Sequence, residues 1–391
     1  MHRYVSVSST FSGAISADSP GNAPRPGTVF LSILGSAHVP DLIVPPGATF
    51  EHLVFRDASG GVAASAVAGA VRVGVGAVLG LKHDLVVTGG FNISDAGALR
   101  GAPVGDGSLP LEVTVTGGLL LGVGSAIVGT HRGVTVRADA MSLRRSAHVS
   151  APAVELSLAH QLELREEGVR IVGETRVAVA APSMVVGQLA VVEATTTTTG
   201  RVEMAIAGDL LVRGMIRAAS VDIEAGRLTM DFIDAAVTTE GMSRSNVGKA
   251  TTDIGSSHAG YAFGNILSPY VPLSCSKSRA VVAAVAIANR GDIAGVGYLV
   301  PRYGSVLQPQ DLGSQSSRGR GGGAVHVKAS TCELTIGTLS SRSSGAVGNW
   351  NTGSGGSIWL ECGTLTGAAT VNAGSQSGSA RGAGSGGRIA M

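Results

Sequence analysis

The chain has 391 residues, of which 58 are glycine, 44% are hydrophobic and 14% are charged, with a formal net charge of +2. A disordered chain would be poor in hydrophobic residues and rich in charge, so this composition predicts an ordered core of small and β-branched side chains. The charges are scattered and aromatics make up only 4%, so we expect no nucleic-acid partner, which would need a basic stripe with interleaved aromatics. No apolar run reaches the roughly 18 residues of a membrane-spanning helix.

Residues 1–27 show no regular pattern and predict an irregular segment. Arg3 is followed by no continuous apolar stretch, so no signal peptide is predicted. Repeat proteins need atypical capping units at both ends. Since neither end of the sequence looks like a cap, we expect the chain to be a piece of a longer protein.

Residues 28–240 consist of short apolar segments separated by Gly, Pro or Asp, the pattern of many short strands. One sequence motif recurs at 84–94, 112–122 and 208–218. It consists of alternating apolar and polar residues, a glycine, and then a second short strand. Strictly alternating runs such as Val154–Leu158 lie between these copies, and alternation places one face inward and the other toward water. The strand pattern leaves two architectures open, a β-sandwich and a parallel β-helix.

Two features favour the β-helix. The glycine falls at the same place in each copy of the motif, as a corner between strands would require. Hairpin dipeptides are nearly absent apart from Asp106-Gly107, and strands that pair in parallel with the next coil need no hairpins.

Residues 241–320 are different, because they hold most of the tyrosines and several prolines. We expect an irregular, loop-rich excursion there, with one short helix at 279–289. Irregular loops on rigid scaffolds often carry function, so this region is a candidate binding surface. A poorly ordered insertion is the alternative.

The candidate binding residues are few. Asp222 and Glu224 belong to the densest acidic group and share a strand face at positions i and i+2, which makes an acidic patch conceivable; a solvated outer face is the simpler interpretation. His258 and Tyr261 lie in a glycine-bounded loop, SSHAGYAFG, where a structural role is the alternative to ligand binding.

No motif predicts a catalytic residue, a metal ligand or a cofactor. The nine histidines show no HExxH pair and no zinc spacing, and no GxSxG elbow occurs. Gly74–Gly80 reads GxGxxxG without a following helix, so we discount a nucleotide loop. Asn92-Ile93-Ser94 is a glycosylation acceptor only if the protein is secreted.

Residues 321–391 contain the clearest repeat. A glycine cluster leads into an alternating strand, and Val325 corresponds to Ile358 and Ile358 to Ile389, steps of 33 and 31 residues that are typical of stacked arrays. The glycines are interpreted as corners between strands. We expect four apolar residues of the second copy to be buried: Ile358, Leu360, Leu365 and Val371.

Cys332 and Cys362 lie one repeat apart. The alignment of Ile358 with Val325 puts Cys362 opposite Ala329 rather than Cys332, which favours buried free thiols over a disulfide.

Residues 257–391 resemble the glycine-rich parallel β-helix segments of large surface or adhesin-like proteins of bacteria and unicellular eukaryotes. The motifs that carry this resemblance are Gly321–Gly323, Gly353–Leu360, Leu365–Gly367, Gly384–Ala390 and the lead-in SSHAGYAFG. The chain departs from the pattern at 267–300 and at Ala368-Ala369. The resemblance implies a fold and a surface location, but no catalytic residues.

The predicted fold is therefore an all-β, right-handed parallel β-helix with an inserted loop region at 241–320. The predicted function is a non-enzymatic surface or extracellular protein for adhesion, ligand contact or a structural role, with surface glycans or proteins as partners. The alternative is a carbohydrate-active or carbohydrate-binding β-helix of the pectin-lyase-like type. Three or more charged side chains converging in one groove would count against the non-enzymatic interpretation.

Overall fold

A computed structural model describes residues 4–6, 30–32, 41–44, 46–55, 65–81, 84–101, 110–131, 133–243, 263–264, 305, 307–316, 319–344, 352–376 and 382–391. These residues form strands and no helix, so the predicted all-β class is confirmed. The strands are β1 (Tyr4–Ser6), β2 (Phe30–Ser32), β3 (Leu42–Val44), β4 (Thr49–Phe55), β5 (Ser65–Ala68), β6 (Val71–Val73), β7 (Val78–Leu81), β8 (Asp84–Val87), β9 (Phe91–Ile93), β10 (Ala98–Gly101), β11 (Leu111–Leu121), β12 (Ala126–Gly129), β13 (Val134–Leu143), β14 (His148–Leu158), β15 (Gln161–Leu164), β16 (Arg170–Ala181), β17 (Ser183–Val186), β18 (Val191–Ala194), β19 (Arg201–Val212), β20 (Met215–Arg217), β21 (Ser220–Thr238), β22 (Phe263–Gly264), β23 (Ala324–Ser340), β24 (Ser357–Gly367), β25 (Thr370–Asn372), β26 (Gly382–Ala383) and β27 (Arg388–Ala390).

The chain divides into two compact units. The first comprises Met1–Glu193 and Met204–Gly214, and the second comprises Ala194–Glu203 and Met215–Met391. The helix expected at 279–289 lies outside the described residues, as does most of the predicted 241–320 excursion.

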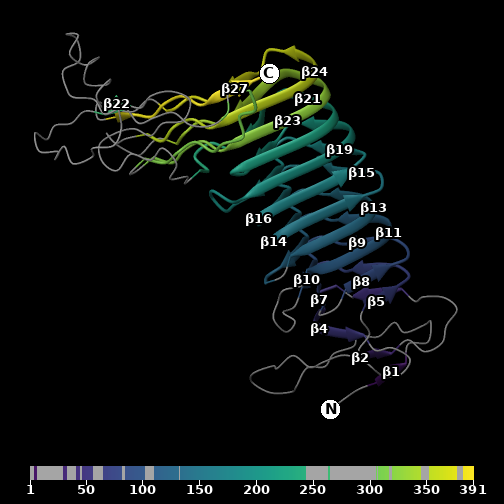
Figure 1. The fold of residues 1–391 in the computed structure, drawn as a ribbon. Coiled ribbons are helices and arrows are strands. Elements are labelled where there is room, and N and C mark those ends of the chain that lie inside the picture. Colours follow the sequence, from purple (N-terminus) through teal and green to yellow (C-terminus); the bar gives the residue numbers. More distant parts are fainter. Residues whose placement is uncertain are drawn as a thin grey trace, which may run out of the picture. The chain divides into compact units, whose positions relative to one another are not determined.

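Strands of the first unit pair in parallel with the strand one repeat further along the chain, as the successive arrows β9, β11, β13 and β15 show in Figure 1. The register places equivalent apolar side chains directly over one another, at steps of 20 to 28 residues. One such column is fully buried: Val71, Phe91, Leu119, Met141, Leu162, Met184 and Leu210. Inward side chains alternate with outward ones in the same strands, as predicted, for example in β14.

A repeated tight turn separates the strands of this unit. Its second residue has a left-handed backbone, at φ 64° for Gly76, 54° for Ala96 and 59° for Ser146. The N–H of this residue donates to a backbone carbonyl in the turn of the next repeat. The Gly76 N–H donates to the Asp95 carbonyl over 3.0 Å, and the Ala96 N–H donates to the Val123 carbonyl over 2.8 Å. The turns are therefore stacked in register like the strands, and Gly74 and Gly76 belong to a turn whereas Gly80 lies within β7.

The second unit repeats this arrangement with wider steps. Val221 pairs with Val325, Val325 with Ile358 and Ile358 with Ile389, all in parallel. The 33- and 31-residue steps predicted for residues 321–391 are thus confirmed. The first step, from β21 to β23, spans 104 residues because it includes the 241–320 region.

The glycine clusters of the second unit let backbones approach closely. Gly356 N–H donates to the Ser341 carbonyl over 2.8 Å, and the Ser341 hydroxyl donates to the Gly323 carbonyl over 2.7 Å. A Cβ atom on Gly356 would overlap both the Gly323 carbonyl oxygen and the Ser341 hydroxyl. Gly337 within β23 and Gly367 at the end of β24 have φ angles of 118° and 116°, a backbone conformation that favours glycine.

Two of the four burial predictions are wrong. Ile358 and Leu360 are buried, but Leu365 is 43% exposed and Val371 is only half-buried. The reason is pairing: β27 covers only the Ser357–Trp359 part of β24. Among the described residues no strand pairs with the far side of Thr364–Gly367, so the inward row there has no apolar cover.

The prediction of free cysteines is also wrong, since Cys332 and Cys362 form a disulfide with their Cα atoms 5.9 Å apart. The predicted alignment itself is confirmed, because Cys362 does pair with Ala329. Ser330 and Thr331 both face outward and interrupt the alternation of β23, so Ala329 and Cys332 both point inward on either side of the interruption. Cys332 therefore reaches Cys362 diagonally.

We expect Gly356→Ala to destabilise the fold by about 1–3 kcal/mol, because the added methyl group overpacks against backbone that cannot move without breaking strand pairing. Gly386→Ala is the matched control, since a Cβ atom there meets nothing within 4 Å, and its effect should stay within about 0.5 kcal/mol. Urea unfolding of the full chain measures both. Equal effects of the two substitutions would contradict the close approach.

We expect Cys332→Ala/Cys362→Ala to lose about 2–4 kcal/mol of unfolding free energy, since the disulfide closes a loop of 30 residues in the unfolded chain. Cys275→Ala, which leaves the disulfide intact, is the control for cysteine removal. Urea unfolding under oxidising conditions measures the difference. If the double variant unfolds at the same urea concentration as the control, the disulfide does not support the fold.

Candidate functional site

Two columns of polar side chains lie side by side on the outward face of β21, β23 and β24. The strand register sets Asp222, His326 and Trp359 opposite one another in the first column. Glu224, Lys328 and Glu361 form the second column, two residues further along the same strands. We call these six residues the polar double column.

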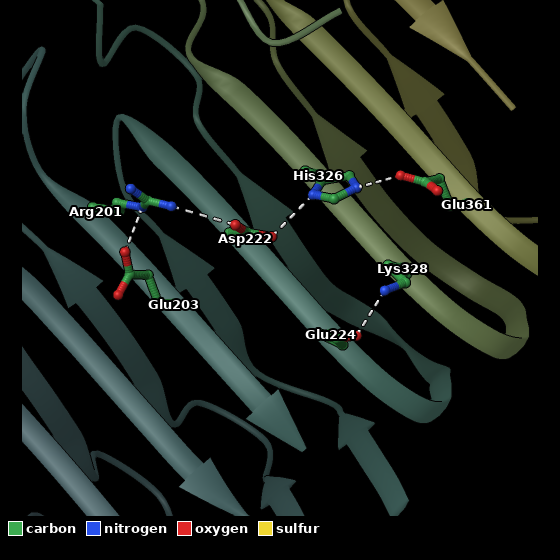
Figure 2. Close-up of polar contacts among 7 residues, drawn as sticks. All are labelled: Arg201, Glu203, Asp222, Glu224, His326, Lys328 and Glu361. Atoms are coloured by element: carbon green, nitrogen blue, oxygen red, sulfur yellow. Dashed lines mark hydrogen bonds and ion pairs between the residues drawn. The ribbon is translucent and has the colours of Figure 1, made fainter. Parts of the chain in front are cut away.

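Hydrogen bonds and ion pairs link this face in a chain, drawn in Figure 2. Arg201 of β19 pairs with Glu203 at 2.6 Å and with Asp222 at 3.4 Å. The other carboxylate oxygen of Asp222 lies 3.0 Å from Nδ1 of His326, and Nε2 of His326 lies 2.9 Å from Glu361 Oε1. His326 thus connects the two columns and three strands.

The His326 imidazole faces a carboxylate at each of its two nitrogens. A neutral ring carries one N–H and can donate to only one of them, whereas the protonated ring donates to both. One ring face also stacks on Trp359, with centroids 4.4 Å apart and an interplanar angle of 24°. The ring is only 24% exposed, so its position is fixed by these neighbours.

Lys328 and Glu224 form the second link, with Nζ 2.8 Å from Oε1. The hydrogen bond from Lys328, and then the attraction of its charge, lower the pKa of the Glu224 carboxyl below 4.5. The same contacts raise the pKa of the Lys328 ammonium above 10.5. Both groups therefore stay charged over a wide pH range although both are exposed.

An open groove of about 620 Å³ runs beside the double column. Its charged lining comes from Glu224, Lys328 and Glu361, and Trp359 supplies an apolar ring. Three charged side chains in one groove meet the criterion that counts against the non-enzymatic interpretation, so a carbohydrate-active role stays a candidate. Among the described residues no group of three or more His, Cys, Asp or Glu side chains could hold a metal ion.

The predicted binding candidates fare differently. Asp222 and Glu224 lie on an outward face as expected, and the structure adds their cationic partners, Arg201 for Asp222 and Lys328 for Glu224. His258 and Tyr261 lie outside the described residues. Sequence reasoning missed His326, Trp359 and Glu361, although the alignment of Val325 with Ile358 already sets His326 opposite Trp359.

No helix in the described part of the chain is long and apolar enough to span a membrane. Comparison with family models, with curated proteins and with solved structures finds no match.

Glu224→Gln should make the protein less stable at neutral pH, because the Lys328 pair is weakened. The folded pKa of Glu224 lies below its unfolded value of 4.5, so the pair stabilises the protein above pH 4.5 and this contribution is lost as pH falls through the folded pKa. The raised pKa of Lys328 means that its contribution is lost only as pH rises above 10.5. Urea unfolding of the natural chain and the variant should therefore differ near neutrality and converge in acid.

A double-mutant cycle with Lys328→Gln isolates the pair from other effects of each substitution. The coupling is expected to be small and to shrink with added salt, since both side chains are exposed. A coupling that is unchanged between neutral and acid pH would show that charge is not its origin.

Proposed function

We propose that this chain is an extracellular or cell-surface protein whose stacked strands form a rigid scaffold for ligand contact. The observation that carries the proposal is the Cys332–Cys362 disulfide. Disulfides form and persist in oxidising environments such as the cell exterior and are rare in the reducing cytosol. The scarcity of charge and the glycine-rich repeat of residues 321–391 agree with a structural array rather than an ordinary globular enzyme.

The scaffold proposed is a right-handed parallel β-helix in each unit. Parallel pairing at steps of 20 to 33 residues, with equivalent side chains in register, supports successive coils of one continuous chain. Parallel crossover connections are right-handed in nearly all proteins, which supports the handedness. The resemblance of residues 257–391 to adhesin-like surface proteins points to the same architecture.

The polar double column is the contact surface in this proposal. Its charges are engaged with one another: Lys328 holds Glu224, and His326 bridges Asp222 and Glu361. Carboxylates fixed in this way are suited to orienting a ligand by hydrogen bonds, whereas glycoside hydrolysis needs one carboxyl free to protonate a leaving group. A non-catalytic contact role is therefore preferred.

A carbohydrate-active enzyme is the second candidate, because Glu224 and Glu361 line the same groove. Hydrolysis of an oligosaccharide by the purified chain, abolished by Glu361→Gln, would replace the contact role by this one.

Surface labelling tests the proposed location. Intact cells that make the protein are treated with a membrane-impermeant biotin reagent, and we expect the chain to be labelled before lysis. Cys332 and Cys362 should resist alkylation until a reductant is added, because they are paired. A cytosolic enzyme of the same cells serves as the unlabelled control. Labelling only after lysis, with both thiols free, would overturn the proposal.

A further inference from the structure

Asn92 lies in the middle of β9 and points outward from the first unit. Phe91 and Ile93 on either side of it are buried, so the alternation of the strand turns the Asn92 side chain to the exposed face. Strand β9 is paired along both edges, since the register sets Asn92 opposite Arg72 of β6 and Leu120 of β11. Its exposure therefore results from its place within the stack of strands.

Asn92-Ile93-Ser94 fits the acceptor triplet of N-linked glycosylation, an asparagine followed two residues later by serine or threonine. No other asparagine of the 391-residue sequence has serine or threonine at that position, apart from this one. A glycan is bulky and projects from the surface, so a folded protein can carry one only where the acceptor side chain is exposed. Asn92 meets this condition.

The Asn92 side chain takes no part in holding the fold. It forms no hydrogen bond with any residue that the structure describes. The side chain of Asn372, by contrast, accepts a hydrogen bond from the N–H of Gly374 over 2.8 Å and so fixes its own turn. A sugar attached to the amide nitrogen of Asn92 would therefore break no contact of the folded chain.

Two glycines beside this asparagine leave space that packing does not require. Gly89 and Gly117 must lack a side chain, because a Cβ atom there would lie 2.7 and 2.9 Å from the carbonyl oxygens of Gly69 and Gly89. The residues that follow them have no such contact. A Cβ atom on Gly90 would come no closer than 3.8 Å to a neighbouring strand, and one on Gly118 would meet nothing within 4 Å. Neither residue has a left-handed backbone, so neither close contact nor conformation accounts for glycine there.

This space belongs to a groove of about 430 Å³. Gly90 and Gly118 line it together with Asn92, Arg72 and Leu120. Its volume lies within the roughly 300–1,000 Å³ of small-molecule sites. Arg72 forms no ion pair in the part of the chain that the structure describes, so its guanidinium can donate to sugar oxygens. The groove thus offers room and hydrogen-bond donors next to the acceptor nitrogen.

We infer that Asn92 carries an N-linked glycan and that this groove holds its first sugar. The co-reactant is a sugar activated at C1 by a lipid diphosphate. Nδ2 of Asn92 attacks C1, and the N–C bond forms as the bond from C1 to the diphosphate oxygen breaks. The diphosphate leaves with the bonding electrons, and the amide nitrogen loses one proton. The transfer takes place in the secretory route, so the inference rests on the proposed extracellular location, which the Cys332–Cys362 disulfide supports independently.

Mass spectrometry of the full chain, isolated from the cells that make it, tests the inference. Trypsin cleaves after Lys82 and Arg100, and the peptide 83–100 contains Asn92 as its single asparagine. We expect this peptide to carry the added mass of a glycan. A peptide N-glycosidase should release that glycan and convert Asn92 to aspartate.

Variants made in the same cells identify the acceptor. Asn92→Gln and Ser94→Ala should each abolish the added mass, whereas Ser94→Thr should retain it, because the transferase needs a hydroxyl two residues after the asparagine. Asn372→Gln is the matched control, since Asn372 also lies in a strand but has no acceptor triplet, and it should leave the mass unchanged.

Glycosidase treatment of the folded protein tests the groove. The enzyme should release the glycan severalfold faster from Gly118→Leu, in which the added side chain fills the groove, than from the natural chain. Gly118→Ala, whose Cβ atom has open space, should behave like the natural chain. Equal rates for all three would show that the first sugar does not lie in the groove.

The inference and the proposed location can fail separately. An unmodified peptide 83–100 from protein that surface labelling places outside the cell would overturn the inference and leave the location standing. A modification that survives Ser94→Ala would also overturn it, since N-linked transfer requires the triplet. Labelling only after lysis together with an unmodified Asn92 would overturn both.

Discussion

Backbone pairing between parallel strands one repeat apart is the constraint on which the rest of this structure depends. Each paired strand is hydrogen-bonded along one edge to the repeat before it and along the other edge to the repeat after it, so paired positions lie over their equivalents at about 4.8 Å spacing. A one-residue slip would turn each inward row outward. The composition follows from this: inward positions hold Val, Leu, Ile and Ala, and turns recur at matching places.

The same pairing dictates what the outward face can hold. Like charges stacked at strand spacing repel one another, so a stable column alternates sign or inserts a neutral ring. Glu224, Lys328 and Glu361 alternate in this way. The neighbouring column places His326 between Asp222 and Trp359. Its imidazole ring hydrogen-bonds to Asp222 and stacks on the Trp359 indole. Electrostatic balance along the stack and a network of hydrogen bonds across the strands are therefore two results of one geometry.

Much of the fold could be predicted because the strand pairing requires similar residues to recur at regular steps in the sequence. The steps from Val325 to Ile358 and Ile389 were readable from glycine clusters and alternation alone. The first unit was harder, because its left-handed turn position holds Ala96 or Ser146 as well as glycine, so no single residue type marks the repeat.

The candidate site was only half predictable, for a topological reason. Asp222 and His326 are 104 residues apart, and the chain between them shows no repeat that would reveal them as neighbours. The disulfide was not predicted for a local reason. A sequence alignment assigns each residue one partner. It does not show that two successive outward residues, Ser330 and Thr331, turn Cys332 toward Cys362.

The disulfide and the polar double column also bear on each other physically. Cys362 directly follows Glu361, and Cys332 lies four residues after Lys328, so the covalent link joins β23 and β24 beside the groove. Leu365, further along β24, is 43% exposed and adds less apolar burial than an inward row normally provides. A crosslink at this point holds β23 and β24 in register beside the exposed end of β24. It thereby keeps Lys328 and Glu361 opposite each other on paired strands.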